Sequence, residues 1–335
     1  MVDLPGYLPA FIASLLILVF IGTKDDINSL DSFRKLSGQF IAACVIVFFG
    51  GIKLPGLDGI FGISYFPSYF GDVFSIFAII IAINAYNLID GLDGLAGMIS
   101  IVGAFVFGTW FFAGGHYPEA IISLSLMGAL AGFIWYNFEP ARIFMGDTGS
   151  QFLGLIMAVL GFRLVQLNAV TPGFTLNAPA VFIFSVMILP MFDTMRIIVI
   201  RLFNGSSPIK PDSKHLHHCL LNKGLSHSRI ALILSFSSAV IIIASLFINS
   251  WNSNLSFVAV IALAALVLPV TSGVLMLNKI FTRRKAGRVV KMGRKVSDKS
   301  SLEKADLHYY RKKIYDLYNV ERKEDHPLSV KRKEI

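Results

Sequence analysis

The sequence has few charged residues and almost no cysteine. Only 15% of its 335 residues are charged and 55% are hydrophobic, whereas globular domains have about 25% charged residues. Two cysteines, Cys44 and Cys219, provide neither a disulfide framework nor a metal-binding spacing. The first residues lack the basic segment and cleavage site of a signal peptide, so we predict none. These absences argue against a soluble or disulfide-stabilised protein and favour membrane spans.

The net charge of +9 is concentrated in the C-terminal part of the chain. Residues 278–335 contain 18 Lys and Arg against 8 Asp and Glu, whereas residues 1–277 are nearly neutral. We therefore predict a membrane-embedded domain at 1–277 and a basic cytoplasmic tail at 278–335. A basic tail beside the last span suits contact with anionic lipid headgroups, with a solvated tail as the alternative. This charge gives no reason to predict a nucleic-acid partner.

Hydropathy predicts the fold class, an all-α integral membrane protein whose multi-span bundle has about nine transmembrane helices. A bilayer core of about 30 Å needs about 20 apolar residues per helix, and the two N-terminal segments are the weakest candidates. The expected spans are 7–21, 38–50, 73–89, 95–113, 120–137, 150–167, 178–200, 230–248 and 255–277.

The basic residues are sorted between the two sides that nine spans would create. Of 12 basic residues before the tail, nine lie in one set of loops, and only Lys53 lies in the other set. Arg163 and Arg196 lie within spans. Because positively charged loops stay cytoplasmic, we predict a cytoplasmic location for loops 22–37, 87–94, 138–149 and 201–229.

These predicted cytoplasmic loops contain most of the residues that could carry chemistry. They are Asp25, Asp26 and Asp31; Asn84, Asn87, Asp90 and Asp93; Asn137, Arg142, Phe144 and Asp147; and Lys210, Asp212, Lys214, His215, His217 and His218. Each group alone has a structural explanation, such as a helix cap or a turn. Asp193 and Arg196 could likewise form an ion pair that only holds helices together.

Taken together, the loop residues indicate phosphate chemistry. Converging carboxylates suit Mg²⁺, which prefers oxygen ligands and substrate phosphates, and Arg, Lys and His suit a diphosphate. The three histidines could instead bind zinc, but no cysteine ligands accompany them in a zinc-site spacing. We therefore predict an integral membrane enzyme acting on a phosphorylated substrate. A transporter is disfavoured because no repeat is visible, and a non-catalytic scaffold remains a further alternative.

Four motifs carry a resemblance to a known family. The strings GxxDD, NAYNLIDGLDGLAG, NFxPARIFMGDTGS and SPxKPDxxHLHHxLLxxGLSH occur in this order over residues 8–277. The chain thereby resembles the polyprenyl-phosphate N-acetylhexosamine-1-phosphate transferases of glycosyltransferase family 4. The resemblance implies a Mg²⁺-dependent enzyme, with Mn²⁺ as a possible substitute, of the bacterial inner membrane. It also implies a role in starting a cell-envelope glycan, such as lipopolysaccharide or teichoic acid.

The resemblance implies roles for individual residues. Asp147 would bind the metal, and Asp25 and Asp26 would lie beside the lipid phosphate, one of them as a base. The remaining residues would contact the UDP-sugar. We expect Asn87, Asp90 and Asp93 near the nucleotide, Phe144 stacked on uracil, Asn137 at the nucleotide sugar, and Lys210, His215, His217 and His218 at the diphosphate.

The resemblance also implies the substrates. The KPDxxHLHH form fits the GlcNAc-type branch, so the expected donor is UDP-GlcNAc or another UDP-N-acetylhexosamine, and the acceptor is undecaprenyl phosphate. Transfer of phospho-MurNAc-pentapeptide to make lipid I is the alternative. Family members usually carry two more helices before GxxDD, so we expect a start placed too late, with a truncated and inactive form as the alternative. A homodimer is a further possible assembly of the chain.

Overall fold

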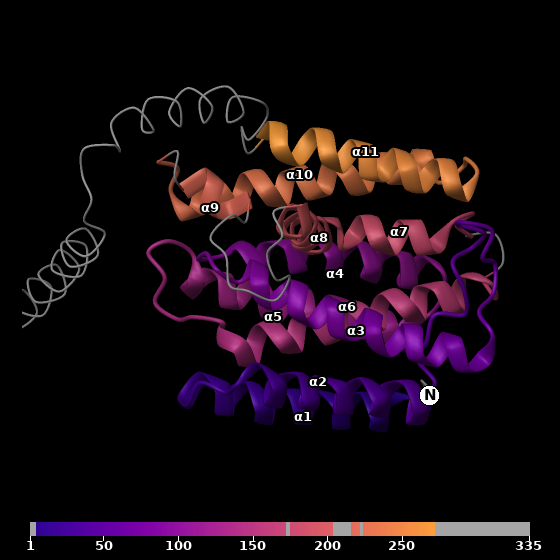
Figure 1. The fold of residues 1–335 in the computed structure, drawn as a ribbon, viewed down its shortest axis with the longest axis horizontal. Coiled ribbons are helices and arrows are strands. Elements are labelled where there is room, and N and C mark those ends of the chain that lie inside the picture. The colour runs from indigo at the N-terminus through magenta and orange to yellow at the C-terminus, as the bar shows by residue number, and fades with distance from the viewer. Residues whose placement is uncertain (1–4, 172–174, 204–215, 222–223, 272–335) are drawn as a thin grey trace, which may run out of the picture. The chain divides into compact units, whose positions relative to one another are not determined.

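The computed structural model describes residues 5–171, 175–203, 216–221 and 224–271, and they form a bundle of helices (Figure 1). The elements are α1 (Leu8–Ile27), α2 (Ser32–Cys44), the π-helical turn η1 (Val45–Phe49), α3 (Ser68–Ile89), α4 (Leu95–Ala113), α5 (Tyr117–Asn137), α6 (Gly146–Asn168), α7 (Pro179–Val186), α8 (Ile188–Phe203), α9 (Leu216–Leu221), α10 (His227–Ile248) and α11 (Ser253–Thr271). The described residues contain no β-strand, only an isolated bridge between Ile60 and Ile63. The predicted all-α fold class is confirmed, whereas the predicted domain boundary at 277 lies outside the described residues.

Each of the nine predicted spans overlaps helix in the described residues, although one of them is broken. Seven helices in the described residues are long and apolar enough to cross a membrane: α1, α2 together with η1, α3, α4, α5, α6 and α10. The described apolar part of α11, Ser253–Leu268, is shorter. Large apolar side chains such as Phe20, Phe77 and Phe247 remain more than half exposed on the outside of the bundle. Lipid rather than water is the solvent that such an outer surface suits.

The prediction of one continuous span at 178–200 was wrong. The chain breaks at Met187 into α7 and α8, which are inclined to one another by 83°. Pro190 lies in the first turn of α8, where its missing N–H costs nothing, although it would have interrupted a longer helix. Figure 1 accordingly shows α7 lengthwise and α8 nearly end-on.

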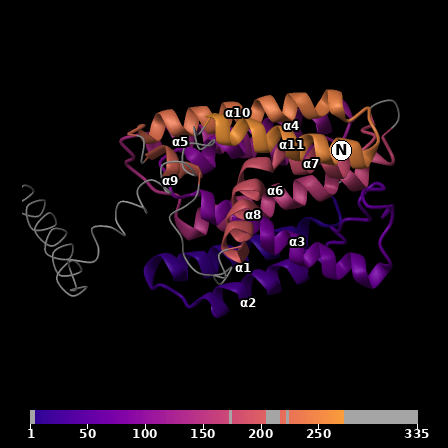
Figure 2. The ribbon, with the colours of Figure 1, turned by 45° about the horizontal axis from the view of Figure 1, so that its top comes forward.

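Helix α6 occupies the centre of the bundle and has the largest buried share of the spans. It contacts α1, α3, α4, α5 and α7, while α1 and α2 form one side and α10 and α11 the opposite side (Figures 1 and 2). Glycines allow the closest approaches. A methyl group on Gly154 would lie 2.5 Å from Ile83 Cα of α3, and one on Gly22 of α1 would lie 2.5 Å from Thr148 Cα. The tight contact of α1 and α3 with α6 brings their polar ends together.

Candidate active site

The polar ends of several helices meet at one end of the bundle, which we call the carboxylate end. Here α1 and α3 end, and α2 and α6 begin. The ammonium group of Lys35 lies at the centre of this end. Its Nζ is 2.8 Å from Asp147 Oδ2, 3.1 Å from Asp25 Oδ2 and 3.2 Å from Asn87 Oδ1. One cation thus joins α2 to α1, α3 and α6.

Asn87 completes the contacts around Asp147. Its amide nitrogen donates a hydrogen bond to Asp147 Oδ1 and another, of 2.9 Å, to Ser150 Oγ. Both oxygens of the Asp147 carboxylate therefore have a donor, one from Asn87 and one from Lys35. This arrangement orients the Asp147 carboxylate.

Asp26 caps the first turn of α6. Its carboxylate accepts hydrogen bonds from the backbone N–H groups of Asp147 at 2.7 Å and Thr148 at 3.1 Å, and from the Thr148 hydroxyl at 2.6 Å. The first N–H groups of a helix have no partner within the helix, and a carboxylate there also interacts favourably with the helix dipole. Gly146 makes this approach possible, because its φ is +64° and a methyl group would lie 2.8 Å from Asp26 Oδ1.

Three amide side chains lie deeper in the membrane domain, next to this cluster. Gln39 of α2 and Asn84 of α3 exchange hydrogen bonds of 2.7 and 3.4 Å, and Gln39 donates to Gln151 Oε1 of α6 at 3.2 Å. Gln39 and Gln151 are completely buried. Buried amides in mutual contact restrict which helix faces can meet, so they set the relative position of α2, α3 and α6.

Asp90 follows the last residue of α3 and has an unusual protonation equilibrium. Burial, together with the nearby carboxylates of Asp147, Asp26 and Asp93, raises the pKa of its carboxyl to about 7. A pKa close to neutral pH is the property required of a group that takes up or releases a proton during a reaction.

A second set of contacts holds the loops around Asp93. Asp93 Oδ2 lies 3.1 Å from His227 Nδ1 at the start of α10. Asn137 is buried and accepts a 2.8 Å hydrogen bond from the Gly94 N–H, while its amide nitrogen donates to the Ile143 carbonyl at 2.7 Å. Asn137 thereby joins the DGLDG turn to the loop before α6.

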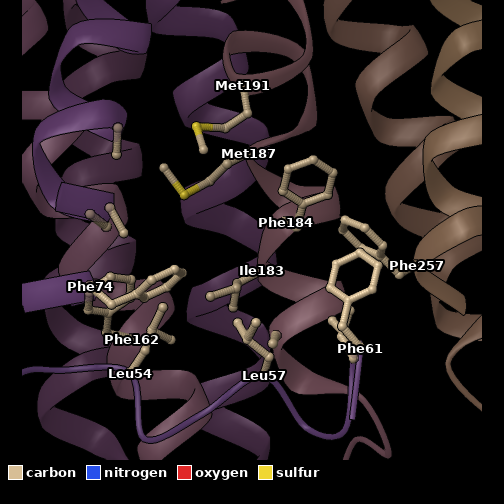
Figure 3. Close-up of a pocket in the computed structure, with 15 residues that line it drawn as sticks. Leu54, Leu57, Phe61, Phe74, Phe162, Ile183, Phe184, Met187, Met191 and Phe257 are labelled. Carbon is tan, nitrogen blue, oxygen red and sulfur yellow. The ribbon is translucent and has the colours of Figure 1, made fainter. Parts of the chain in front are cut away.

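An apolar cavity of about 380 Å³ lies between α3, α6, α7, α8 and the segment around Leu57 (Figure 3). Met187 and Met191 line one end, and Leu54 and Leu57 line the other. The volume falls within the roughly 300–1,000 Å³ range of ligand pockets.

On α3 the cavity lies in line with the carboxylate end. Phe74, Ala78 and Ala82 line it at intervals of one helical turn, and the next two turns bring Tyr86 and then Asp90. Tyr86 is completely buried, and its hydroxyl has no hydrogen-bond partner among the described residues. One helix face therefore joins the apolar cavity to the polar cluster.

Comparison with known proteins places this arrangement in a family. A family model described as glycosyl transferase family 4 matches residues 8–165. The undecaprenyl-phosphate alpha-N-acetylglucosaminyl 1-phosphate transferase of Haemophilus influenzae is 30% identical over 258 residues, which cover 74% of this chain and 71% of that relative. The chain belongs to glycosyl transferase family 4.

Two further family 4 relatives are similar over a smaller share of their length. The decaprenyl-phosphate N-acetylglucosaminephosphotransferase of Mycobacterium tuberculosis is 32% identical over 243 residues, covering 68% of this chain and 60% of the relative. The probable undecaprenyl-phosphate N-acetylglucosaminyl 1-phosphate transferase of Bacillus subtilis is 31% identical over 188 residues, covering 55% and 51%. The match thus spans about half to three fifths of the length of these relatives.

The structure brings together five of the predicted site residues of this family 4 chain. Asp25, Asn87 and Asp147 meet around Lys35, and Asp26 and Asp90 lie beside them. Phe144 lies on the loop before α6 and is 75% exposed, so its ring is free to stack on a planar group. Asn137 is only 4% exposed and both ends of its amide are occupied within the chain. Its predicted contact with a nucleotide sugar therefore stays a prediction.

The histidine motif is described only in part. His217 and His218 belong to α9, whose first residue is Leu216. Lys210 and His215 lie outside the described residues. The predicted contacts of all four with a diphosphate stay untested.

Two residues of the site were not among the sequence candidates. Lys35 was counted only as a basic residue that marks the side of the membrane, although a cation in the first turn of a helix opposes the helix dipole and so signals another purpose. His227 belongs to the GLSH end of the fourth motif but was not selected. The contacts of Lys35 with Asp147 and of His227 with Asp93 join residues 112 and 134 positions apart, which a linear motif does not reveal.

The carboxylates of Asp25 and Asp147 are oxygen donors of the kind that Mg²⁺ prefers. Within the described ranges, no three His, Cys, Asp or Glu side chains come together as a closed metal site. Mg²⁺ is usually held by one or two carboxylates together with water and substrate phosphates. Asp147, with the Asp25 carboxylate bound to the same ammonium group, supplies that kind of oxygen ligand.

Proposed function

We propose that this chain is a phosphoglycosyl transferase that moves N-acetylhexosamine-1-phosphate from a UDP-sugar to a polyprenyl phosphate. The expected donor is UDP-GlcNAc, the expected acceptor is undecaprenyl phosphate, and the released product is UMP. The names of the relatives support the transfer of GlcNAc-1-phosphate to a polyprenyl phosphate. The observation that carries the proposal is the meeting of Asp25, Asn87 and Asp147 around Lys35.

The apolar cavity supports a lipid acceptor. Its lining consists of apolar side chains, among them Met187, Met191 and Phe184 (Figure 3). By helical spacing, the cavity residues of α3 lie on the same face as Asp90. A polyprenyl phosphate has an apolar chain and one charged end. The cavity would take up part of the chain, and the phosphate would lie at the carboxylate end.

In the proposed reaction, an oxygen of the polyprenyl phosphate forms a bond to the β-phosphorus of the UDP-sugar. The bond from this phosphorus to the oxygen that bridges the two phosphates breaks, and UMP leaves with that oxygen. A phosphate monoester loses its second proton near pH 6, so the acceptor is mostly dianionic at neutral pH. Some acceptor molecules still carry that second proton, and Asp90, with a pKa of about 7, is suited to accept it from them.

The polar groups would act by charge and position. Lys35 would draw phosphate oxygens toward the cluster and hold the Asp147 carboxylate in its orientation. Asp147 would hold Mg²⁺, which would neutralise charge on the diphosphate when bound. Asp26 would keep the start of α6 in place through its hydrogen bonds to the backbone. We further propose that the carboxylate end faces the cytoplasm, where UDP-sugars are available, in the bacterial inner membrane.

A donor panel tests the proposal and its alternatives. The protein is incubated with undecaprenyl phosphate and Mg²⁺, and UMP release is measured with UDP-GlcNAc, UDP-GalNAc and UDP-MurNAc-pentapeptide. The proposal predicts the largest kcat/KM with UDP-GlcNAc. A preference for UDP-MurNAc-pentapeptide would instead assign lipid I synthesis, and no turnover with any donor would favour a non-catalytic homologue. UMP formation without acceptor, at one molecule per enzyme, would indicate a two-step route through an aspartyl phosphate.

Asp147→Asn tests the metal assignment. The substitution removes a negatively charged oxygen ligand while leaving shape and the hydrogen bonds of the helix start, so we expect at least a hundredfold loss of UMP release in folded protein. Asp31→Asn is the matched control, because Asp31 caps α2 at an exposed position and Asn is an equally good cap. Activity of Asp147→Asn within a few-fold of wild type would refute the assignment.

A further inference from the structure

Helix α8, which follows the break after α7, carries a buried carboxylate that contacts the start of another helix. Asp193 is 3% exposed, and its two oxygens lie 3.1 and 3.2 Å from the backbone nitrogen of Leu216. Arg196, one turn further along α8, donates to Asp193 Oδ1 through Nε at 3.3 Å and Nη2 at 3.0 Å. Asp193 therefore joins α8 to α9 across 23 residues of sequence.

The physical basis of this contact is the backbone N–H at the described start of α9. Leu216 is the first described residue of α9, and its N–H donates to the Asp193 carboxylate, as the first N–H groups of a helix need an acceptor outside the helix. A carboxylate is the favoured acceptor there because its charge complements the helix dipole. A buried carboxylate is in turn tolerated only when it is paired and hydrogen-bonded, which Arg196 and Leu216 provide.

The contact fixes one end of the helix that carries two of the motif histidines. His217 and His218 follow Leu216 directly in α9, so a contact that fixes the Leu216 backbone also fixes the backbone of these two residues. The side chains of Leu216 and Leu220 are buried in the core that also contains Ile230 of α10. Helix α9 is therefore held by apolar packing on one face and by Asp193 at its first N–H.

A second buried ion pair shows what a purely structural arrangement looks like in the same protein. Glu119 of α5 is also 3% exposed and binds Arg163 of α6 at 2.7 Å. It accepts its hydrogen bonds from the side chains of Tyr7 and Arg163. It lies at the end of the bundle opposite the carboxylate end, where α5 begins and α6 ends. Asp193, in contrast, binds the backbone of a helix that carries a candidate substrate-binding motif.

We propose that Asp193 is a positioning residue for the UDP-sugar: through the Leu216 N–H it fixes the backbone of α9, the helix to which the motif residues His217 and His218 belong. This inference rests on the proposed function, because it assumes that the histidines bind the donor. The inference also gives the bend between α7 and α8 a role, which is to bring Asp193 to the start of α9. The bend directs α8 away from the axis of α7, and Asp193 on α8 then meets the start of α9.

The test is a comparison of Asp193→Asn with Glu119→Gln. Both substitutions remove the charge of a buried carboxylate that is paired with arginine and keep its size. We expect Asp193→Asn to raise the KM for UDP-GlcNAc about tenfold and to leave the KM for undecaprenyl phosphate within twofold of wild type, because a small displacement of binding groups affects the ligand they contact. Glu119→Gln should leave both values within twofold.

A double variant separates positioning from general loss of packing. If Asp193 acts through the histidines, Asp193→Asn combined with His217→Ala should be no worse than His217→Ala alone, because contacting residues in one pathway are not additive. Additive losses, or an unchanged donor KM in Asp193→Asn, would overturn the inference while leaving the proposed function intact. A wild-type protein without UMP release would overturn both. If Asp193→Asn fails to fold, Arg196→Lys, which weakens the hold on Asp193, should raise the donor KM several-fold, and an unchanged KM would overturn the inference.

Discussion

The buried carboxyl of Asp90 leads to a prediction in which loss of a functional group increases stability. Burial and three neighbouring carboxylates raise the pKa of Asp90 from its ordinary value of 3.8 to about 7 in the folded protein. Between these two values the folded state binds more protons than the unfolded state. The free energy of unfolding must therefore fall as the pH rises through this window and must level off above about pH 8. Asp90→Asn abolishes this contribution because the amide does not titrate.

The magnitude follows from the shift. About three pKa units correspond to about 4 kcal/mol between the two limits, since one unit is about 1.4 kcal/mol. As the pH rises from 5 to 8.5, the wild-type protein loses the stability that corresponds to about two of these units, which is ~3 kcal/mol as an upper limit. The side chain is partly exposed, so contact with water reduces this value, and we expect Asp90→Asn to gain about 1–2 kcal/mol on wild type over this range.

The assay is the thermal unfolding midpoint of detergent-solubilised protein, measured at pH 5 and pH 8.5 with a chelator so that no bound cation offsets the carboxylates. A difference of 1–2 kcal/mol corresponds to a shift of several degrees for a chain of this size. Asp31→Asn, at an exposed helix cap, should show no pH-dependent gain. Equal midpoint differences between Asp90→Asn and wild type at the two pH values would refute the reasoning. The same variant should lose most of its UMP release if Asp90 handles a proton.

Three further changes test other parts of the site. Lys35→Met leaves the carboxylates of Asp25 and Asp147 without their shared cation, so we expect a lower thermal midpoint at pH 8 and at least a tenfold loss of UMP release, whereas Arg34→Met, at an exposed neighbouring position, should change neither. Gly146→Ala places a methyl group 2.8 Å from Asp26 Oδ1 at a φ of +64°, so it should lower the unfolding free energy by about 1–3 kcal/mol, while Gly128→Ala, with open space around it, should not destabilise the protein. His217→Ala or His218→Ala should raise the UDP-GlcNAc KM or lower kcat in steady-state UMP release, and unchanged values for both would remove these residues from the donor site.

The sequence predicts the spans well because each span is a local property. A run of apolar residues long enough to cross a bilayer is recognisable without knowledge of its neighbours, and each predicted segment overlaps helix in the described residues. The break at Met187 was missed because apolar residues continue on both sides of it. Pro190 was the available sign, since a proline inside a predicted span marks a place where the helix is interrupted or restarts.

The candidate site was predicted at the level of its loops but not of its contacts. Asp25, Asp90 and Asp147 were selected because carboxylates at span ends are costly without a purpose. The division of labour between Asp25 and Asp26 was not predictable, because it depends on Asp26 meeting the start of α6, which is 121 residues away. The internal contacts of Asn137 and the central place of Lys35 have the same origin: they depend on which helix ends become neighbours.

The two ends of α6 have a mechanical consequence. At its first turn the backbone is held by Asp26 of α1, and near its last turn Arg163 binds Glu119 and lies over the ring of Tyr7, which precedes α1. Side-chain contacts thus join α1 and the residue before it to α6 at both ends of the two helices. A sliding movement of α6 along α1 would break both sets of contacts, so the position of Asp147 relative to α1 is fixed. Movements that admit the donor or release UMP should therefore leave the start of α6 in place. Hydrogen exchange should be slow at the start of α6.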